Sequence, residues 1–260
     1  MEDCLSRGGI GSHIAAHRGN RRKVMLQSLI LGTLAASANL LGGIILVHRR
    51  WEDRMLRYFI ALGAGFMMSV ALLDMLPDSL RFSAHWAPLL VLAGYCTIHL
   101  VEHTITSHFH LGEETHAVHS HTGISVLVGL SMHAFFDGVA IASGFVISSM
   151  LGWLIFGAVI LHKMPEGFTV ASVMLASGRS RKAALAASLT LALSTVAGVL
   201  VIALVPRWVY AGLPLSAGVA IYVAASDLIP EVNREPGLRM ALVFFLGVGL
   251  FLAIQAMASL

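Results

Sequence analysis

Charged residues are scarce in this sequence. Of its 260 residues, 57% are hydrophobic and only 12% are charged, about half the charged fraction of a soluble domain. The chain has only two cysteines, Cys4 and Cys96, far apart in the sequence, so neither a disulfide framework nor a thiolate metal site is expected. It also lacks the G-x-x-x-x-G-K-[ST] motif of nucleotide-binding proteins. We therefore expect no nucleotide or nucleic acid as a partner and no organic cofactor.

What the sequence has instead is a series of long apolar runs. A helix that crosses a bilayer needs about 20 mostly apolar residues, and no alternation of period two suggests a barrel. Eight runs are predicted to span: Val24–Val47, Tyr58–Leu76, Ala87–Ile105, Ile124–Ser148, Met150–Ala176, Ala183–Val205, Leu213–Ile229 and Met240–Ser259. The sequence thus predicts an all-α integral membrane protein with one domain over residues 1–260 and an N-terminal tail over 1–23.

Lysine and arginine in the short connections predict how the chain is oriented. Only Arg81 and Arg207 lie in the connections on one side of the membrane. Nine lie on the other side: Arg49, Arg50, Arg54, Arg57, Arg179, Arg181, Lys182, Arg234 and Arg239. Because short cytoplasmic loops carry the positive charge, we expect both termini outside the cytoplasm of a multi-pass protein of the cell (inner) membrane. The basic N-terminal tail favours the reverse orientation.

The connection over residues 106–122 is rich in histidine and has no lysine or arginine. Its histidines are His108, His110, His116, His119 and His121. Such a tract binds metals such as zinc weakly and adaptably, and the charge count places it on the cytoplasmic side. The alternative is a solvated polar loop that happens to use histidine.

A polar pattern occurs twice inside apolar runs: HAFFDGVAIAS begins at His133 and HKMPEGFTVAS begins at His162. In a helix, residues four apart share a face, so His133 pairs with Asp137 and His162 pairs with Glu166. One histidine in an apolar helix is more often a hydrogen-bonded core residue, but a carboxylate near the bilayer centre costs about 2.5–3.5 kcal/mol. Two matched copies therefore predict a metal site, and this donor set suits zinc, iron(II), manganese or cobalt. The glycine after each carboxylate allows close helix approach.

A second pattern is also repeated: LLDMLPDSL near the end of the second run is similar to ASDLIPEVN near the end of the seventh. Asp74 corresponds to Asp227. Internal repeats of this kind are typical of transporters with a substrate site near the midplane. We therefore predict pseudo-symmetric repeats, with Asp74 and Asp227 along a cation route. The alternative, favoured for the later carboxylates Asp78 and Glu231, is that such residues only mark helix ends.

With these motifs, the sequence resembles the ZIP family of divalent metal transporters over all eight runs, the histidine-rich loop included. HAFFDG and HKMPEG match the metal motifs of the family's fourth and fifth helices. The resemblance implies that His133, Asp137, His162 and Glu166 are metal ligands, joined by Met67 of GAGFMM as in bacterial members. It further implies import of zinc, or of iron, manganese or cadmium, toward the cytoplasm. Homodimers, and a sliding of helices 1, 4, 5 and 6 against the rest, are implied as well.

Three positions depart from relatives that hold two metal ions. Ala134 and Lys163 replace ligands in the fourth and fifth helices, and the sixth run, Ala183–Val205, has no carboxylate. This predicts a single intramembrane metal site. We hypothesise that the Lys163 ammonium takes the place of the second cation and balances Asp137 or Glu166. Alternatively, Lys163 extends elsewhere or lines a water-filled path.

Rival functions remain open at this point. Cation-diffusion exporters also use H-x-x-x-D pairs, although eight runs and the Pro-Glu-Gly after the second histidine argue against that class. The segment HLVEH, with His99, Glu102 and His103, satisfies the H-x-x-E-H pattern of some zinc peptidases, but it leaves the His133 and His162 motifs unexplained. A metal-sensing or purely structural membrane protein is a third class.

Overall fold

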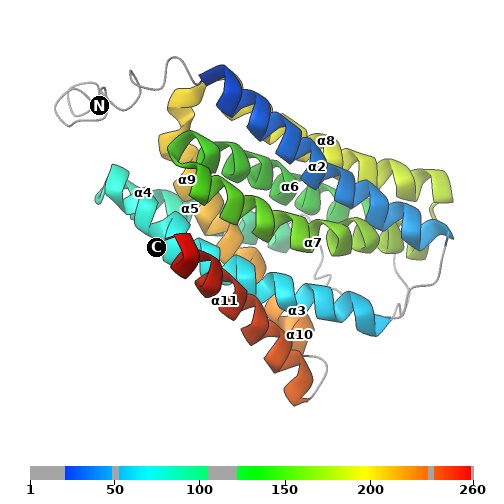
Figure 1. Cartoon of the computed structure of the whole chain (residues 1–260). Coiled ribbons are helices and arrows are strands. Elements are labelled where there is room, and N and C mark those ends of the chain that lie inside the picture. The colour runs from blue at the N-terminus through cyan, green and yellow to red at the C-terminus, as the bar shows by residue number, and fades with distance from the viewer. Residues whose placement is uncertain (1–20, 49–52, 105–121, 234–236, 259–260) are drawn as a thin grey trace.

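The computed structural model describes residues 21–48, 53–104, 122–233 and 237–258, and all of its regular elements there are helical (Figure 1). The helices are α2 (Arg21–His48), α3 (Asp53–Val70), α4 (Leu76–Phe82), α5 (Trp86–Thr104), α6 (Thr122–Ile147), α7 (Ser149–Ala176), α8 (Arg181–Leu204), α9 (Val209–Tyr222), α10 (Ile229–Asn233) and α11 (Leu238–Ala258). Two π-helical segments, η1 (Ala71–Met75) and η3 (Val223–Leu228), and one 3₁₀ turn, η2 (Pro206–Trp208), join them.

The predicted all-α membrane fold is confirmed. Among the described residues, seven helical stretches are long and apolar enough to cross a membrane, and α5 is not one of them. The third predicted run coincides with α5, which has 19 residues and carries His99, Glu102 and His103 in its last two turns. Every predicted run falls on a helix, so the protein is a multi-pass integral membrane protein.

The second and seventh runs are longer than predicted, and each contains a π-helical segment. The second extends over Asp53–Phe82 and the seventh over Pro206–Asn233. Asp74 lies in η1 and Asp227 lies in η3. Both copies of the repeated sequence pattern therefore include a π-helical segment. π-Helical turns occur frequently at functional sites.

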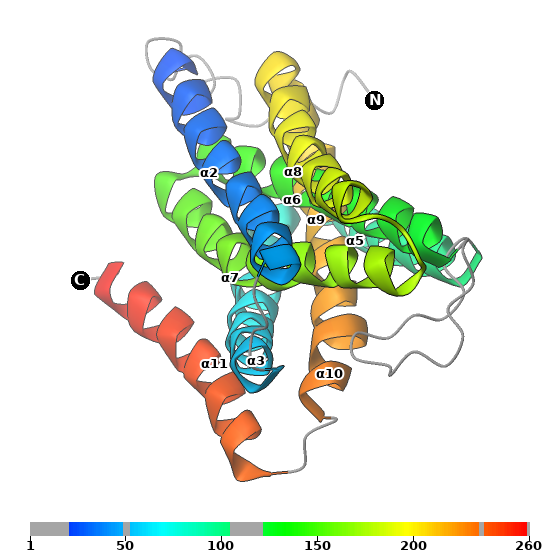
Figure 2. The ribbon, with the colours of Figure 1, turned by 90° about the vertical axis from the view of Figure 1, so that its right-hand side faces the viewer.

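The helices pack as two groups of four (Figures 1 and 2). We call α2, α6, α7 and α8 the α7 group. The α3 group consists of α5, α11, α3 with its continuation through η1 and α4, and α9 with its continuation through η3 and α10. The two groups meet where α3 packs on α7 and where α6 packs on α9.

Pairs of glycines bring helices within each group into backbone contact. A Cβ atom added at any of these glycines would collide with a backbone carbonyl of the partner helix, so no other residue allows the same approach. The pairs are Gly42 and Gly167 for α2–α7, Gly138 and Gly198 for α6–α8, Gly65 and Gly247 for α3–α11, and Gly94 and Gly218 for α5–α9. The close approach predicted at Gly138 and Gly167 is confirmed.

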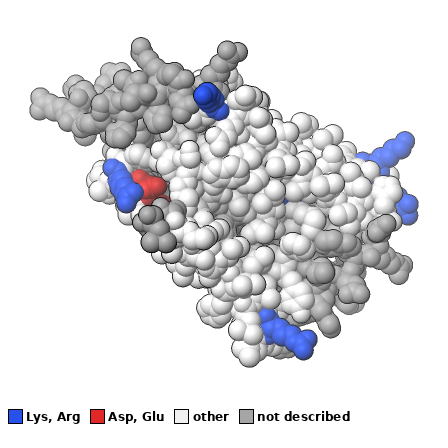
Figure 3. Space-filling model, viewed as in Figure 1, with Lys and Arg blue, Asp and Glu red and all other residues white. Residues whose placement is uncertain are grey.

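The outer surface suits a lipid environment. Large apolar side chains are exposed along α11, including Leu242, Phe245 and Leu246. In Figure 3 the described residues form a broad uncharged face, with charged side chains only toward its ends. The ionisable cluster described below is, by contrast, in the interior.

Candidate metal centre

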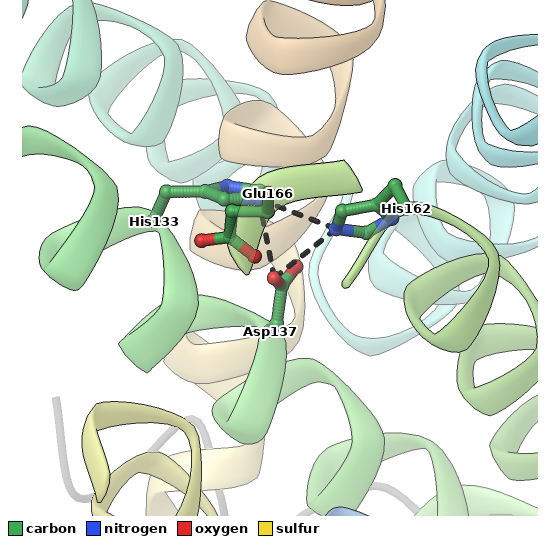
Figure 4. Close-up of side chains that lie close together, drawn as sticks. All are labelled: His133, Asp137, His162 and Glu166. Atoms are coloured by element: carbon green, nitrogen blue, oxygen red, sulfur yellow. Dashed lines mark hydrogen bonds and ion pairs between the residues drawn. The ribbon is translucent and has the colours of Figure 1, made fainter. Parts of the chain in front are cut away.

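The two H-x-x-x-[DE] motifs face each other. His133 and Asp137 lie one turn apart on α6, and His162 and Glu166 lie one turn apart on α7 (Figure 4). One potential ligand atom from each residue lies within 4.8 Å of the others. All four side chains are buried, the most exposed being Glu166 at 7%. The predicted convergence of two imidazoles and two carboxylates is thus present in the structure.

Asp137 lies between the two imidazoles. Its Oδ2 atom is 3.2 Å from His133 Nε2 and 3.3 Å from His162 Nε2. His162 Nδ1 donates to the carbonyl oxygen of Ala158 at 2.8 Å. Because this bond places the proton on Nδ1, the Nε2 lone pair of His162 points toward the cluster, as in many metal-binding histidines.

Lys163 lies inside the cluster rather than at the membrane boundary. The side chain is fully buried. Its Nζ atom is 2.7 Å from Asp137 Oδ2 and 2.5 Å from Glu166 Oε2. The ammonium therefore bridges the two carboxylates. A charge removed from water needs this kind of pairing, because each unpaired ion would carry a large desolvation cost.

Sequence reasoning missed one residue of the site, Asn39 on α2, which is fully buried. With its amide turned so that both polar atoms have suitable neighbours, the nitrogen donates to Lys163 O at 2.5 Å and to Glu166 Oε2 at 3.3 Å. The other Glu166 oxygen, Oε1, is buried without a hydrogen-bond partner. A polar amide in the middle of an apolar run was the signal that could have identified Asn39.

Met67 is buried in α3, the helix that packs on α7. One turn earlier on the same helix, Gly63 approaches α7 so closely that a Cβ atom there would lie 3.6 Å from His162 Cβ. Residues four apart share a helical face, so Met67 lies on the side of α3 that is turned toward α7.

Asp74 and Asp227 are not part of the four-residue cluster. Asp74 accepts a hydrogen bond from Gln255 Nε2 of α11 at 2.9 Å. Asp227 lies close enough to Glu102 for the two carboxylates to interact electrostatically, and Glu102 accepts a hydrogen bond from the Tyr222 hydroxyl at 2.9 Å. Both aspartates therefore belong to the α3 group.

The HLVEH segment forms a different arrangement on α5. The rings of His99 and His103 have centroids 4.0 Å apart, and His103 Nδ1 donates to His99 O at 3.0 Å. Within the described ranges, the residues around His133 form the one group of three or more potential ligands that converge on a point. The histidines of the 106–122 loop, His108 to His121, lie outside the described residues.

Comparisons with known proteins place the chain beside zinc transporters. The profile of the ZIP zinc transporter family matches residues 22–126 and 113–255. The zinc transporter SLC39A7 of mouse is 32% identical over 130 residues, which cover 45% of this chain and 27% of the mouse protein. The zinc transporter zipt-7.1 of Caenorhabditis briggsae is 25% identical over 270 residues, 79% of this chain and 68% of that protein.

The zinc transporter ZIP10 of mouse is 30% identical over 180 residues, 55% of this chain and 21% of the relative. The chain thus spans about a quarter of the length of the mammalian relatives that it matches. The family profile, in contrast, covers nearly all of the chain, in two overlapping matches. The chain belongs to the ZIP zinc transporter family, a family of transporters rather than enzymes.

Proposed function

We propose that this protein carries a divalent transition-metal cation, with zinc as the first candidate, across the membrane toward the cytoplasm. The observation that carries the proposal is the buried group of four potential ligand atoms within 4.8 Å of one another, between two helices that are apolar enough to span a bilayer. Metal is here the transported substrate. Its dehydration is offset by imidazole and carboxylate ligands in an otherwise apolar interior.

The proposed ligands are His133, Asp137, His162 and Glu166, with Met67 as a further ligand from α3. Glu166 Oε1 has no protein partner and His162 Nε2 presents a lone pair, so both atoms are available to an ion. Because imidazoles and carboxylates bind metal only when deprotonated, acid weakens the binding. The same donor set accepts iron, manganese or cadmium, since selection among these ions depends largely on geometry and availability.

Lys163 acts in this proposal as a tethered cation that replaces a second metal ion. Its support is the position of Nζ within 2.7 Å of both neighbouring carboxylates. The wild-type protein should bind one zinc per chain, and Lys163→Asp, which exchanges the cation for a ligand, should bind up to two. Isothermal titration gives the stoichiometry. Two equivalents in the wild-type protein would refute this role.

The transport route extends beyond the central site. We assign Asp74 and Asp227 to the path of the ion, and the histidines of the 106–122 loop to its reception on the cytoplasmic side, with both termini outside. The α7 group slides against the α3 group as a unit in a homodimer of the cell membrane. Support for the sliding comes from the glycine pairs: a Cβ atom at any of them would collide with a backbone carbonyl in the same group, whereas at Gly63, which faces the other group, the nearest atoms lie at 3.6 Å.

Uptake of metal by reconstituted protein tests the proposal. Proteoliposomes should accumulate labelled zinc without nucleotide, and iron, manganese and cadmium should compete. His162→Ala serves as the blank, and His85→Ala, which removes an exposed histidine in the turn just before α5, serves as the matched control. Equal uptake by the wild type and His162→Ala would overturn the proposal. Zinc movement only outward, in exchange for protons, would favour an exporter.

A further inference from the structure

A cavity of about 810 Å³ lies between the two helix groups, at the membrane face where α2 begins and where α4, α6 and α8 end. This volume is within the range of small-molecule sites. The α7 group contributes Val24, Val146 and Ile202 to the wall, and the α3 group contributes Phe82 and Tyr210. The cavity lies apart from the metal cluster, none of whose residues is among its lining residues.

The cavity has an apolar wall and a basic rim. Among the described residues, those with charged side chains that line it are Asp78, Arg81 and Arg207. Arg81 donates to Asp78 at 2.7 Å, so the charge of that pair is largely balanced, and the exposed Arg207 leaves one positive charge in excess. Trp208 is exposed beside this rim, and exposed tryptophans at helix ends are typical of the headgroup level of a bilayer.

We propose that this cavity binds an anionic phospholipid. An acyl chain matches the apolar wall, and a phosphate that carries one negative charge matches Arg207 with Arg81 at the rim. Basic pockets between membrane helices recognise lipid headgroups in this way. A metal cation is disfavoured by the net positive rim, and a small soluble anion would leave the apolar wall in water. Because both helix groups line the cavity, a bound lipid holds them in the arrangement of this structure.

Native mass spectrometry of the purified protein tests this site, with phosphatidylglycerol and phosphatidylcholine of identical acyl chains as the probes. The wild-type protein should retain phosphatidylglycerol in preference. The double variant Arg81→Gln/Arg207→Gln should lose that preference, by about fivefold for each arginine. Val146→Trp, which fills the apolar part and keeps both arginines, should also reduce retention.

The control variant, Arg181→Gln/Lys182→Gln, removes two exposed positive charges at the start of α8, at the other end of that helix. Its retention of phosphatidylglycerol should equal that of the wild type. The proposal is overturned if both lipids are retained equally by the wild type. It is also overturned if the control loses as much as the cavity variants, because binding would then depend on total charge.

A second inference rests on the proposed metal site and concerns Asn39. Glu166 Oε2 accepts from both Lys163 and Asn39, whereas Oε1 has no partner. The carboxylate is thereby held through Oε2, and Oε1 is left buried without a protein partner. Asn39 comes from α2 and also donates to the Lys163 carbonyl of α7. We infer that Asn39 is a positioning residue, which fixes the orientation of Glu166 for metal binding.

Asn39→Leu tests this role. Loss of a group that orients a ligand typically weakens metal affinity by 10- to 100-fold, so zinc titration should show at least a tenfold loss. Asn39→Ser supplies a hydroxyl donor in place of the amide and should restore part of the zinc affinity that Asn39→Leu loses. The infrared carboxylate bands that change on zinc binding should shift in Asn39→Leu, which a purely structural role would not cause.

Ser37→Ala, an exposed position of the same helix, is the control and should bind zinc as the wild type does. If the wild type binds zinc and Asn39→Leu matches it in affinity and infrared bands, the role of Asn39 is refuted. If the wild type itself binds no zinc, the proposed metal site fails instead.

Discussion

The two helix groups hold their ionisable residues in different ways. In the α7 group, Asp137, Lys163 and Glu166 are buried and paired with one another. In the α3 group, Asp74 and Glu102 are only partly buried, and each accepts a hydrogen bond from a neutral side chain. Among the described residues, only the first arrangement brings three or more potential metal ligands together. This difference supports the proposal that the α7 group supplies most of the ligands for the cargo and that the α3 group lines its path.

Removal of one histidine from each group should give the largest difference in zinc uptake between the two groups. His133→Ala should lower zinc uptake at least about 100-fold, since it deletes a ligand rather than a group that only orients one. His99→Ala removes the ring stacked on His103 in α5 and should leave uptake near the wild-type value. Initial rates in proteoliposomes measure both. Comparable losses in the two variants would mean that the groups share the binding site.

The buried ion pairs give the next largest effect. Lys163→Met leaves Asp137 and Glu166 without their cation, and breaking a buried pair in this way costs about 3–5 kcal/mol. Thermal unfolding without metal should therefore occur at a clearly lower temperature, and saturating zinc should restore much of the loss by replacing the missing charge. Lys182→Met, at an exposed position, is the control. A loss that zinc does not reduce would contradict the tethered-cation role.

Glycine substitutions test whether the helices pack more tightly within a group than between the groups. Gly138→Ala forces a methyl group against the backbone of α8 at Thr195, and overpacking of this kind costs about 1–3 kcal/mol. Gly63→Ala faces α7 across the groups, with its nearest neighbours at 3.6 Å, and should be nearly neutral. Unfolding temperatures of the two variants give the comparison. Equal destabilisation would argue against two tightly packed units.

The aspartates of the π-helical segments should give the smallest effect. Asp74→Asn and Asp227→Asn keep the side-chain volume and remove one negative charge each. Because such charges raise the local cation concentration rather than bind the ion, uptake at low salt should fall by less than about tenfold, with zinc affinity at equilibrium unchanged. Initial rates in proteoliposomes give the uptake, and equilibrium titration gives the zinc affinity. A loss of affinity would move these residues into the binding site.

The convergence of the four potential ligands was largely predictable from the sequence, because their spacing follows a local rule. The spacing of His133 with Asp137 and of His162 with Glu166 places each pair on one helical face without any tertiary information. Asn39 was not predictable in this way, since its partners lie more than 120 residues away on α7. The sequence led us to expect the Lys163 ammonium beside one carboxylate, Asp137 or Glu166, and its contact with both became visible only in the structure.

The fold was predictable where apolar runs are uninterrupted, and less so at Asp and Pro. The second predicted span stopped at Leu76, before Pro77, whereas the helical stretch continues to Phe82. A proline in the first turn of a helix needs no backbone donor, so α4 begins smoothly after η1. The π-helical turns themselves depend on backbone hydrogen bonds that composition does not specify.

The glycine pairs also restrict how ion preference is adjusted. Gly167 fixes the distance between α7 and α2, and Gly138 fixes that between α6 and α8. Each helix that carries donors is therefore held at a set distance from one helix of its own group, and altering either distance would require changes on two helices at once. In the proposed transporter, selectivity for one cation over another is accordingly tuned by exchanging a donor, such as Asp137 or His162, rather than by moving these helix pairs.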